Sequence, residues 1–235
     1  MKRRLLALLS LVLLIGTTLP IYGEVNKVEA AEQSFNEDEI TEMAEEYLDG
    51  FEIIQSDELE SSFSVIEDDG ERYEYETLVL NPDTDEETVQ VNKYLLVNNK
   101  RENLVETSEE LVNNSNEMVA MAKASCHGVT GGVISWKGTR ATAYFDSCLT
   151  KKFVNIIDES QGATGAIAGL SAVIRNTTKL GKIISYAGFV SSILWAAGYT
   201  IKKISENGKY GIGFHMARNP ITGKINKSMG IPWRQ

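Results

Sequence analysis

Two cysteines and two histidines are the residues of this chain with the most specific chemistry. Cys126 and His127 are adjacent, so a thiolate beside an imidazole is one interpretation of this dipeptide. Neither His127 nor His215 stands in an HExxH or other metal-ligand spacing. The N-terminal signal described below predicts export from the reducing cytosol. We therefore favour a disulfide between Cys126 and Cys148. We expect no metal site.

No other catalytic motif of known mechanism is found. The run closest to GxSxG is Gly169–Val173, which lies inside an apolar segment where no exposed nucleophile is expected. The glycine-rich run Gly208–Gly213 lacks the GxxxxGK[ST] order of a phosphate-binding loop. Carboxylates are so numerous that a pair such as Glu45 and Glu46 indicates no hydrolytic site. The sequence predicts a protein that is not an enzyme, with no catalytic residues and no cofactor; a wall-directed hydrolase is the weaker enzymatic alternative.

The N-terminus has the layout of a secretory signal peptide. A basic start, Lys2–Arg4, precedes an eleven-residue apolar run, Leu5–Ile15, interrupted only by a serine. This run is shorter than the roughly 20 residues that cross a bilayer. We predict a signal peptide over residues 1–30, cleavage between Ala30 and Ala31, and a secreted, extracellular mature chain. An uncleaved membrane anchor is the alternative.

The mature chain divides by charge. Residues 31–125 contain 27 acidic and five basic residues, a net charge of −22, whereas residues 126–235 contain 14 basic and four acidic ones, a net charge of +10. Fifteen of the 19 glycines also follow Cys126. We therefore predict an acidic domain or pro-region over 31–124 and a basic, glycine-rich domain over 125–235.

The acidic half shows the pattern of a small α+β domain. Two helices are expected, over Asn36–Gly50 and Leu104–Ala122. Between them an antiparallel meander is predicted from alternating apolar residues and from turns at Asp69-Gly70 and residues 81–83. Its expected strands are Ser62–Ile66, Tyr73–Leu80 and Val89–Val97.

The basic half is also predicted to mix strands and helices, so the fold class is α+β. A Cys126–Cys148 bond would clamp a β-hairpin, and another β-hairpin is expected from Tyr210 onward. Between them a short helix around Phe153 precedes two apolar segments that we interpret as a helical hairpin. The expected elements are strands Val133–Trp136 and Thr139–Phe145, and helical segments Gly162–Ile174 and Ile183–Ile201.

The second apolar segment is suited to membrane insertion. Ile183–Ile201 is 19 residues long, has no charge, and is flanked by lysines. Gly165 and Gly169, four residues apart in the first segment, would let two helices approach closely. Anionic lipid is the expected partner of this cationic half, and no nucleic acid is expected. The insertion candidates are Ile183, Ile184, Phe189, Val190, Ile193, Leu194, Trp195 and Tyr199. Alternatively, the same hairpin is the buried core of a soluble domain.

The acidic half has a possible role in latency. Its negative charge could mask the cationic half until the two separate, and Ala122-Lys123-Ala124 offers a cleavage point between Ala124 and Ser125. The alternative is that the acidic residues only solubilise the protein.

The stretch Ser135–Thr139, with Tyr144, Asp146 and Cys148, precedes the apolar hairpin and the run Gly208–Phe214. Together with the signal peptide, this layout resembles the large, heat-labile secreted bacteriocins of Gram-positive bacilli, the geobacillin type. The resemblance covers about half of the chain. It implies killing of related Gram-positive bacteria through the cell envelope, with no catalytic residues; an immunity protein or receptor is not identified. A secreted soluble binding or inhibitory protein is the alternative function.

Overall fold

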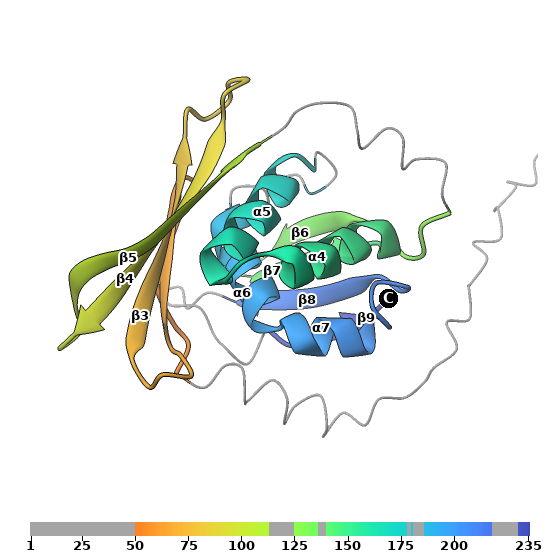
Figure 1. The fold of residues 1–235 in the computed structure, drawn as a ribbon. Helices are drawn as coiled ribbons and strands as arrows, with labels where there is room; N and C mark the ends of the chain where they lie inside the picture. Colours follow the sequence, from red (N-terminus) through yellow and green to blue (C-terminus); the bar gives the residue numbers. More distant parts are fainter. Residues whose placement is uncertain (1–49, 113–124, 136–139, 178–179, 181–185, 218–229) are drawn as a thin grey trace, which may run out of the picture. The chain divides into compact units, whose positions relative to one another are not determined.

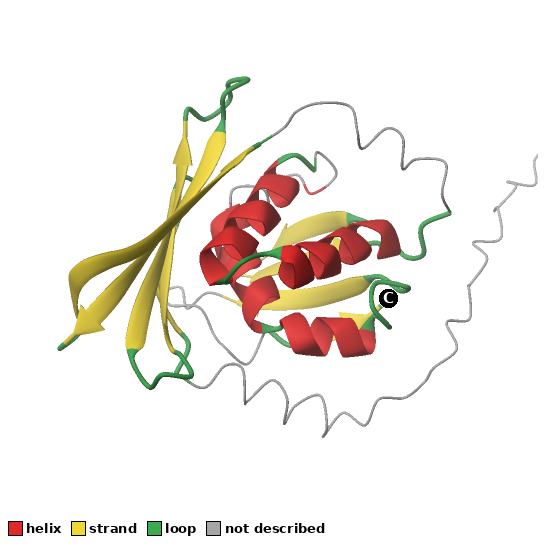
Figure 2. Cartoon of the chain, in the orientation of Figure 1, coloured by secondary structure: helices red, strands yellow, loops and turns green. Residues whose placement is uncertain are grey.

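The protein is described here by a computed structural model covering residues 50–112, 125–135, 140–177, 180, 186–217 and 230–235. These residues belong to one compact unit, Ser34–Gln235. They form two antiparallel sheets and four α-helices (Figures 1 and 2), which confirms the α+β class. The predicted signal peptide and the predicted helix up to Gly50 lie outside the described residues, apart from Gly50 itself.

The first sheet, sheet A, is a five-stranded meander in the order β1-β2-β3-β4-β5. Its turn between β2 and β3 contains Asp69 and Gly70, and Gly70 adopts the left-handed conformation with φ 81°. The predicted hairpin at this turn is confirmed. The predicted strand Val89–Val97 is also confirmed, because the structure has a strand over Thr88–Val97. The strands are β1 (Glu52–Ser56), β2 (Glu60–Ile66), β3 (Arg72–Leu80), β4 (Thr88–Val97) and β5 (Lys100–Leu111).

The predicted helix over Leu104–Ala122 is wrong in its first part, because residues up to Leu111 form strand β5. Asn98 and Asn99 both have positive φ, 53° and 59°, and so make a two-residue turn that returns the chain antiparallel to β4. Strand pairing therefore overrides the helical preference of the glutamates in this segment. Residues 113–122 of the prediction lie outside the described residues.

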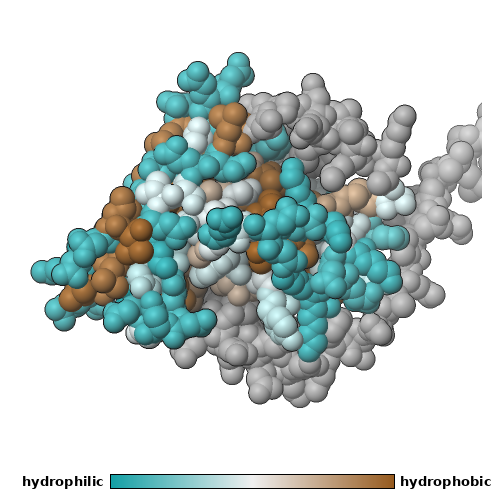
Figure 3. Space-filling model, in the orientation of Figure 1, coloured by the Kyte–Doolittle hydropathy of each residue, from teal (hydrophilic) through white to brown (hydrophobic). Residues whose placement is uncertain are grey.

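β5 is an edge strand of sheet A with exposed apolar side chains. Leu104, Val105 and Leu111 are 56%, 53% and 51% exposed. Figure 3 shows hydrophobic atoms over sheet A among hydrophilic neighbours. Charged residues are frequent elsewhere along the strand (Lys100, Arg101, Glu102, Glu106, Glu109 and Glu110), which opposes pairing with another strand.

The second sheet, sheet B, joins the two predicted hairpins of the basic half. β6 (Gly131–Ser135) pairs with β7 (Arg140–Phe145), β7 pairs with β8 (Ile212–Ala217), and β8 pairs with β9 (Pro232–Arg234). The chain leaves this sheet after β7 and returns at β8, and all four helices lie within that connection.

The first predicted helical segment, Gly162–Ile174, matches one helix to within a residue, whereas the second is divided between two. The helices are α4 (Ser147–Glu159), α5 (Ala163–Arg175), α6 (Ala187–Ala196) and α7 (Gly198–Ile204). The segment predicted as one helical element is divided at Ala197, where φ is −81° and ψ is 8°. Gly198 then starts α7 close to α4, since a Cβ there would lie 3.1 Å from Ile157 Cγ2.

The helices contribute to two hydrophobic cores. The sheet B core joins the inner face of sheet B to all four helices. The sheet A core joins Phe63, Tyr75 and Val91 to α5 through Ile167 and Ala172, and further members are Phe51, Val89, Val112 and Ala168. The predicted domain division at residue 124 stays a prediction, but the sheet A core draws side chains from both sides of it.

The packing of α6 on sheet A predicts a large effect at Gly188. A Cβ at Gly188 would overlap Ser61 Oγ and lie 3.1 Å from Thr77 Cβ. We expect Gly188→Lys to lower the free energy of unfolding by about 3 kcal/mol, measured by urea denaturation. Gly165→Lys is the matched helical control, because its nearest neighbouring atom is 3.9 Å away, and it should cost less than about 1 kcal/mol. Equal stability of the two variants would contradict the packing of α6 against β2 and β3.

Candidate functional site

The predicted insertion element is largely interior. Tyr199 is 74% exposed on α7. Ile183 and Ile184 lie outside the described residues. Four other candidates on α6 belong to the sheet B core and are at most 5% exposed: Phe189, Val190, Ile193 and Leu194.

Trp195 connects α6 to both cores. Its ring centroid is 6.0 Å from that of Phe63 and 5.6 Å from that of Tyr75. Phe63 stacks between Phe51 and Tyr75 at 4.7 and 5.1 Å, so four aromatic rings from β2, β3, α6 and the residue before β1 are in contact. Such ring pairs add to the energy of apolar burial. Trp195, one of the insertion candidates, is therefore packed against sheet A in this structure.

Small residues let the helices approach one another and the sheets. Ser171 on α5 and Ser191 on α6 hydrogen-bond through their hydroxyls at 2.5 Å. Gly169 faces α4, where a Cβ would lie 3.1 Å from Ile156 Cγ2. Gly165 and Gly169 also line an open groove of about 390 Å³ between α4, α5 and the end of β5. Of the predicted glycine pair, Gly169 therefore serves the approach of α5 to α4, whereas Gly165 has room for a side chain.

A buried ion pair joins the acidic and basic halves. Arg175 Nε at the end of α5 donates to Glu87 Oε1 at 2.5 Å, and the two side chains are 7% and 9% exposed. Glu87 also accepts a hydrogen bond from the backbone N–H of Asp83 at 2.8 Å. Burial alone would raise the pKa of Glu87, but Arg175 and the Asp83 N–H stabilise the carboxylate and hold its pKa below the usual 4.5.

A second polar contact lies where α5 begins. Thr164 donates to Glu106 Oε1 at 2.5 Å and accepts from Ser108 Oγ at 3.0 Å, so the first turn of α5 is held to β5. Among the ion pairs between described residues, only Arg175–Glu87 crosses from one half to the other. The proposed electrostatic masking stays a prediction, and direct pairing contributes little to it within the described residues.

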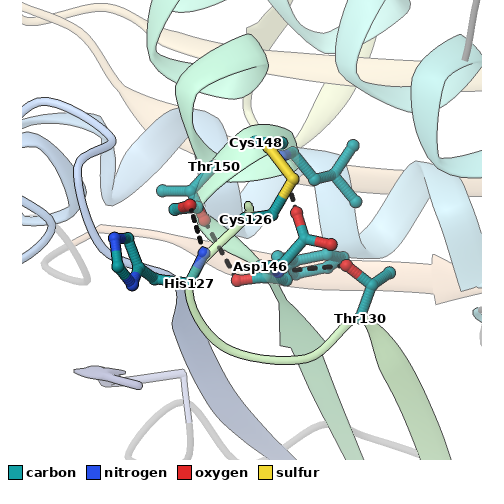
Figure 4. The surroundings of a disulfide bond; sticks show 9 residues. Cys126, His127, Thr130, Asp146, Cys148 and Thr150 are labelled. Atoms are coloured by element: carbon teal, nitrogen blue, oxygen red, sulfur yellow. Dashed lines mark hydrogen bonds between the residues drawn. A yellow bond between two sulfur atoms is a disulfide. The ribbon is translucent and has the colours of Figure 1, made fainter. Parts of the chain in front are cut away.

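The disulfide predicted between Cys126 and Cys148 is confirmed (Figure 4). It joins the segment before β6 to the first turn of α4, with the Cα atoms 5.4 Å apart. Backbone contacts reinforce it: the His127 N–H donates to Ser147 Oγ at 2.8 Å, and the Asp146 N–H donates to Thr130 Oγ1 at 3.0 Å. The two ends of the β6–β7 hairpin are thereby held together.

The residues around the disulfide do not form a catalytic pair. Figure 4 shows the His127 ring pointing away from the sulfur atoms. Within the described ranges one group of three metal-ligand residues lies together, Cys126, Asp146 and Cys148. Its sulfurs are bonded to each other, and Asp146 accepts from the Leu149 N–H at 2.9 Å as the N-cap of α4. No thiolate is available there for nucleophilic attack or metal binding.

The predicted cleavage points are only partly described. Ser125 is exposed. Ala30, Ala31 and Ala124 lie outside the described residues.

Sequence reasoning missed the residues that join sheet A to the helices. Glu87 is one of 27 acidic residues in its half, and Arg175 lies 88 positions away. The position of Arg175 between two apolar segments was the available signal, since a cation at the end of a buried helix needs a partner.

Comparisons with protein-family models, with curated proteins and with solved structures found no match to this chain. In the part of the chain that the structure describes, no helix combines the length and apolarity needed to cross a membrane.

The disulfide predicts a measurable share of stability. The bond links residues with a sequence separation of 22. Replacing both cysteines, Cys126→Ala with Cys148→Ala, should lower the free energy of unfolding by about 3 kcal/mol, because the unfolded chain without the bond gains conformational entropy. Denaturant titration measures the change. Thr130→Val, which removes one hydrogen bond at the same hairpin, should cost about 1 kcal/mol. A double cysteine variant no less stable than Thr130→Val would refute the stabilising role of the bond.

The Glu87–Arg175 pair predicts a pH-dependent junction between sheet A and α5. Because the pKa of Glu87 is lowered by folding, its contribution to stability is present above about pH 4.5 and is lost as the pH falls through the folded-state value. Glu87→Gln should cost about 3 kcal/mol at pH 7 by leaving Arg175 buried without its carboxylate.

Urea unfolding of the wild type and Glu87→Gln at pH 7 and pH 3 measures this dependence, with the exposed neighbour substitution Glu86→Gln as the control. The difference in the free energy of unfolding between the wild type and Glu87→Gln should be smaller at pH 3 than at pH 7. A difference that does not change with pH would show that Glu87 is not the titrating group.

Proposed function

We propose that this chain is a secreted antibacterial protein of the bacteriocin type, which kills related Gram-positive bacteria by acting on their membrane. The described structure is then its stored form. The observation that supports this proposal is the position of α5 and α6: sheet A, which is built only from the acidic half, covers one apolar side of α5 and Trp195 of α6. In this proposal, sheet A is a separable cover for part of the helical hairpin that is predicted to insert.

The contact between cover and helices is suited to release. Besides apolar packing, its polar contacts among the described residues include one buried ion pair, a hydrogen bond from Arg175 to the Glu58 carbonyl, and the hydrogen bonds of Thr164. The segment between sheet A and the basic half is residues 113–124, where a cleavage point is predicted before Ser125. Cutting there would leave sheet A held only by non-covalent contacts, so that lipid could compete for the apolar helices.

The uncovered helices have the composition of an interfacial membrane element. α6 has ten residues and no charge, and the last turn of α7 has Lys202 and Lys203. At about 1.5 Å per residue α6 is about 15 Å long, half of the hydrocarbon thickness. Once sheet A has left, Trp195 would enter the outer leaflet while the lysines meet anionic headgroups.

A soluble binding or inhibitory protein is the second candidate. The observation that favours it is the burial of Phe189, Val190, Ile193 and Leu194 in the sheet B core, because these side chains would have to leave sheet B as well as lose the cover. In that case α5 and α6 remain core, and function resides on the exposed surface.

A cleavable full-length protein tests the first proposal. A specific protease sequence is placed within 113–124, and dye release from anionic liposomes and killing of Gram-positive bacilli are measured before and after cutting. We expect cutting to increase both. The variant Ser108→Cys with Thr164→Cys should suppress the increase, because its disulfide would hold β5 on α5, where the native hydroxyls are 3.0 Å apart.

A matched variant locks the helices to each other instead. Ser171→Cys with Ser191→Cys joins α5 to α6 at a native hydroxyl distance of 2.5 Å but leaves sheet A free. It should retain release and killing after cutting. If the cut, folded protein neither releases dye nor kills, the antibacterial proposal fails and the binding protein remains.

A further inference from the structure

The outer face of sheet B has an aromatic cluster that none of the preceding roles uses. Tyr144 on β7 and Trp233 on β9 both pair with Gly213 on β8, so the three positions lie in one row across the sheet. His215 is two residues along β8 and pairs with Thr142. Because side chains alternate along strands, these positions face away from the core residues of the same strands, Ala143, Phe145, Ile212 and Phe214, although the half-buried Trp233 also contacts that core.

Gly213 lets the indole of Trp233 lie across the sheet. A Cβ at Gly213 would come within 2.6 Å of Trp233 Cζ2 and 2.7 Å of Cε2, so any larger residue would displace the ring. Tyr144 contacts Trp233 edge-on, with the centroids 6.3 Å apart and the planes at 82°. The His215 ring lies 4.4 Å from that of Trp233. The three rings therefore form a platform with fixed geometry.

The platform keeps polar ring atoms available for a ligand. Thr142 Oγ1 and His215 Nδ1 are 2.9 Å apart and hydrogen-bonded, which orients the exposed imidazole. The hydroxyl of Tyr144, Nε1 of Trp233 and Nε2 of His215 have no hydrogen-bond partner within the described residues. Apolar ring faces are thus bordered by three groups that can donate or accept a hydrogen bond.

Among the described residues, no cation of the protein lies over the rings of Tyr144 or Trp233. Other aromatic rings of the protein are covered by its own cations: Lys93 lies 3.9 Å from the Tyr73 ring, Arg101 lies 4.6 Å from the Tyr94 ring and Arg234 lies 4.0 Å from the Tyr210 ring. Tyr144 and Trp233 instead contact each other and a histidine. Aromatic contact, rather than charge, is therefore what these two rings offer a ligand.

We propose that this aromatic platform (Tyr144, Trp233 and His215 over Gly213) binds a neutral pyranose glycan, the glycan strand of the bacterial cell wall. A sugar ring presents an apolar C–H face, which packs on the indole of Trp233, and a rim of hydroxyl or amide groups, which match the polar atoms of the three rings. This inference rests on the proposed antibacterial function only in taking the bacterial cell wall as the source of the glycan. The glycan would then be the receptor for that function on the target envelope.

Binding is tested with full-length mature protein, Ala31–Gln235, by calorimetry with the tetrasaccharide of N-acetylglucosamine and by co-sedimentation with wall sacculi stripped of teichoic acid. We expect both to bind. Trp233→Ala and Tyr144→Ala should each weaken binding at least about tenfold, equivalent to one lost aromatic contact. His215→Ala, an exposed substitution, should weaken it several-fold while preserving the fold, as judged by circular dichroism.

Tyr199→Ala removes an aromatic ring that is 74% exposed on α7, away from the platform residues in sequence and element. It is the matched control and should leave glycan binding unchanged. The inference is overturned if neither probe binds, or if folded His215→Ala and Trp233→Ala variants bind like the wild type. It is also overturned if Trp233→Ala abolishes binding to phosphatidylglycerol vesicles instead. Glycan binding without killing would retain the platform and refute the antibacterial proposal, whereas killing without glycan binding would do the reverse.

Discussion

Burial of the apolar surfaces of α5 and α6 is the constraint on which the rest of the structure depends. The two helices contain few charges, so no side of either can be left broadly exposed to water at low cost. Sheet B covers one part of this surface and sheet A covers another, with Trp195 in contact with both cores. Two sheets that are separate in sequence thereby belong to one compact unit.

Local constraints position the elements that meet at these helices. The Cys126–Cys148 bond and its adjoining hydrogen bonds hold the start of α4 against the β6–β7 hairpin. At the other core, Arg175 and Glu87 neutralise each other where α5 ends, which removes the penalty that either buried charge alone would impose. Small residues, above all Gly188, permit close contact between α6 and sheet A.

The same arrangement has opposite meanings for the two candidate functions. For an antibacterial protein, sheet A shields the apolar helices during export, and its loss exposes them to lipid. For a soluble binding protein, the helices are a permanent scaffold that supports the outer face of sheet B. The aromatic platform is compatible with both, because it lies on the side of sheet B opposite the core and does not require α6 to move.

The sequence by itself determined the α+β class, the disulfide, the β2–β3 hairpin and most strands, because these follow from local periodicity, turn residues and the presence of only two cysteines. It did not reveal β5, where pairing to β4 through the Asn98-Asn99 turn overrode a helical pattern. Tertiary structure alone decided that Glu87 meets Arg175, that Phe63 stacks near Trp195, and that Tyr144 and Trp233 share Gly213. These contacts join residues far apart in the chain, and their partners become specific only when sheet register and helix packing place them together.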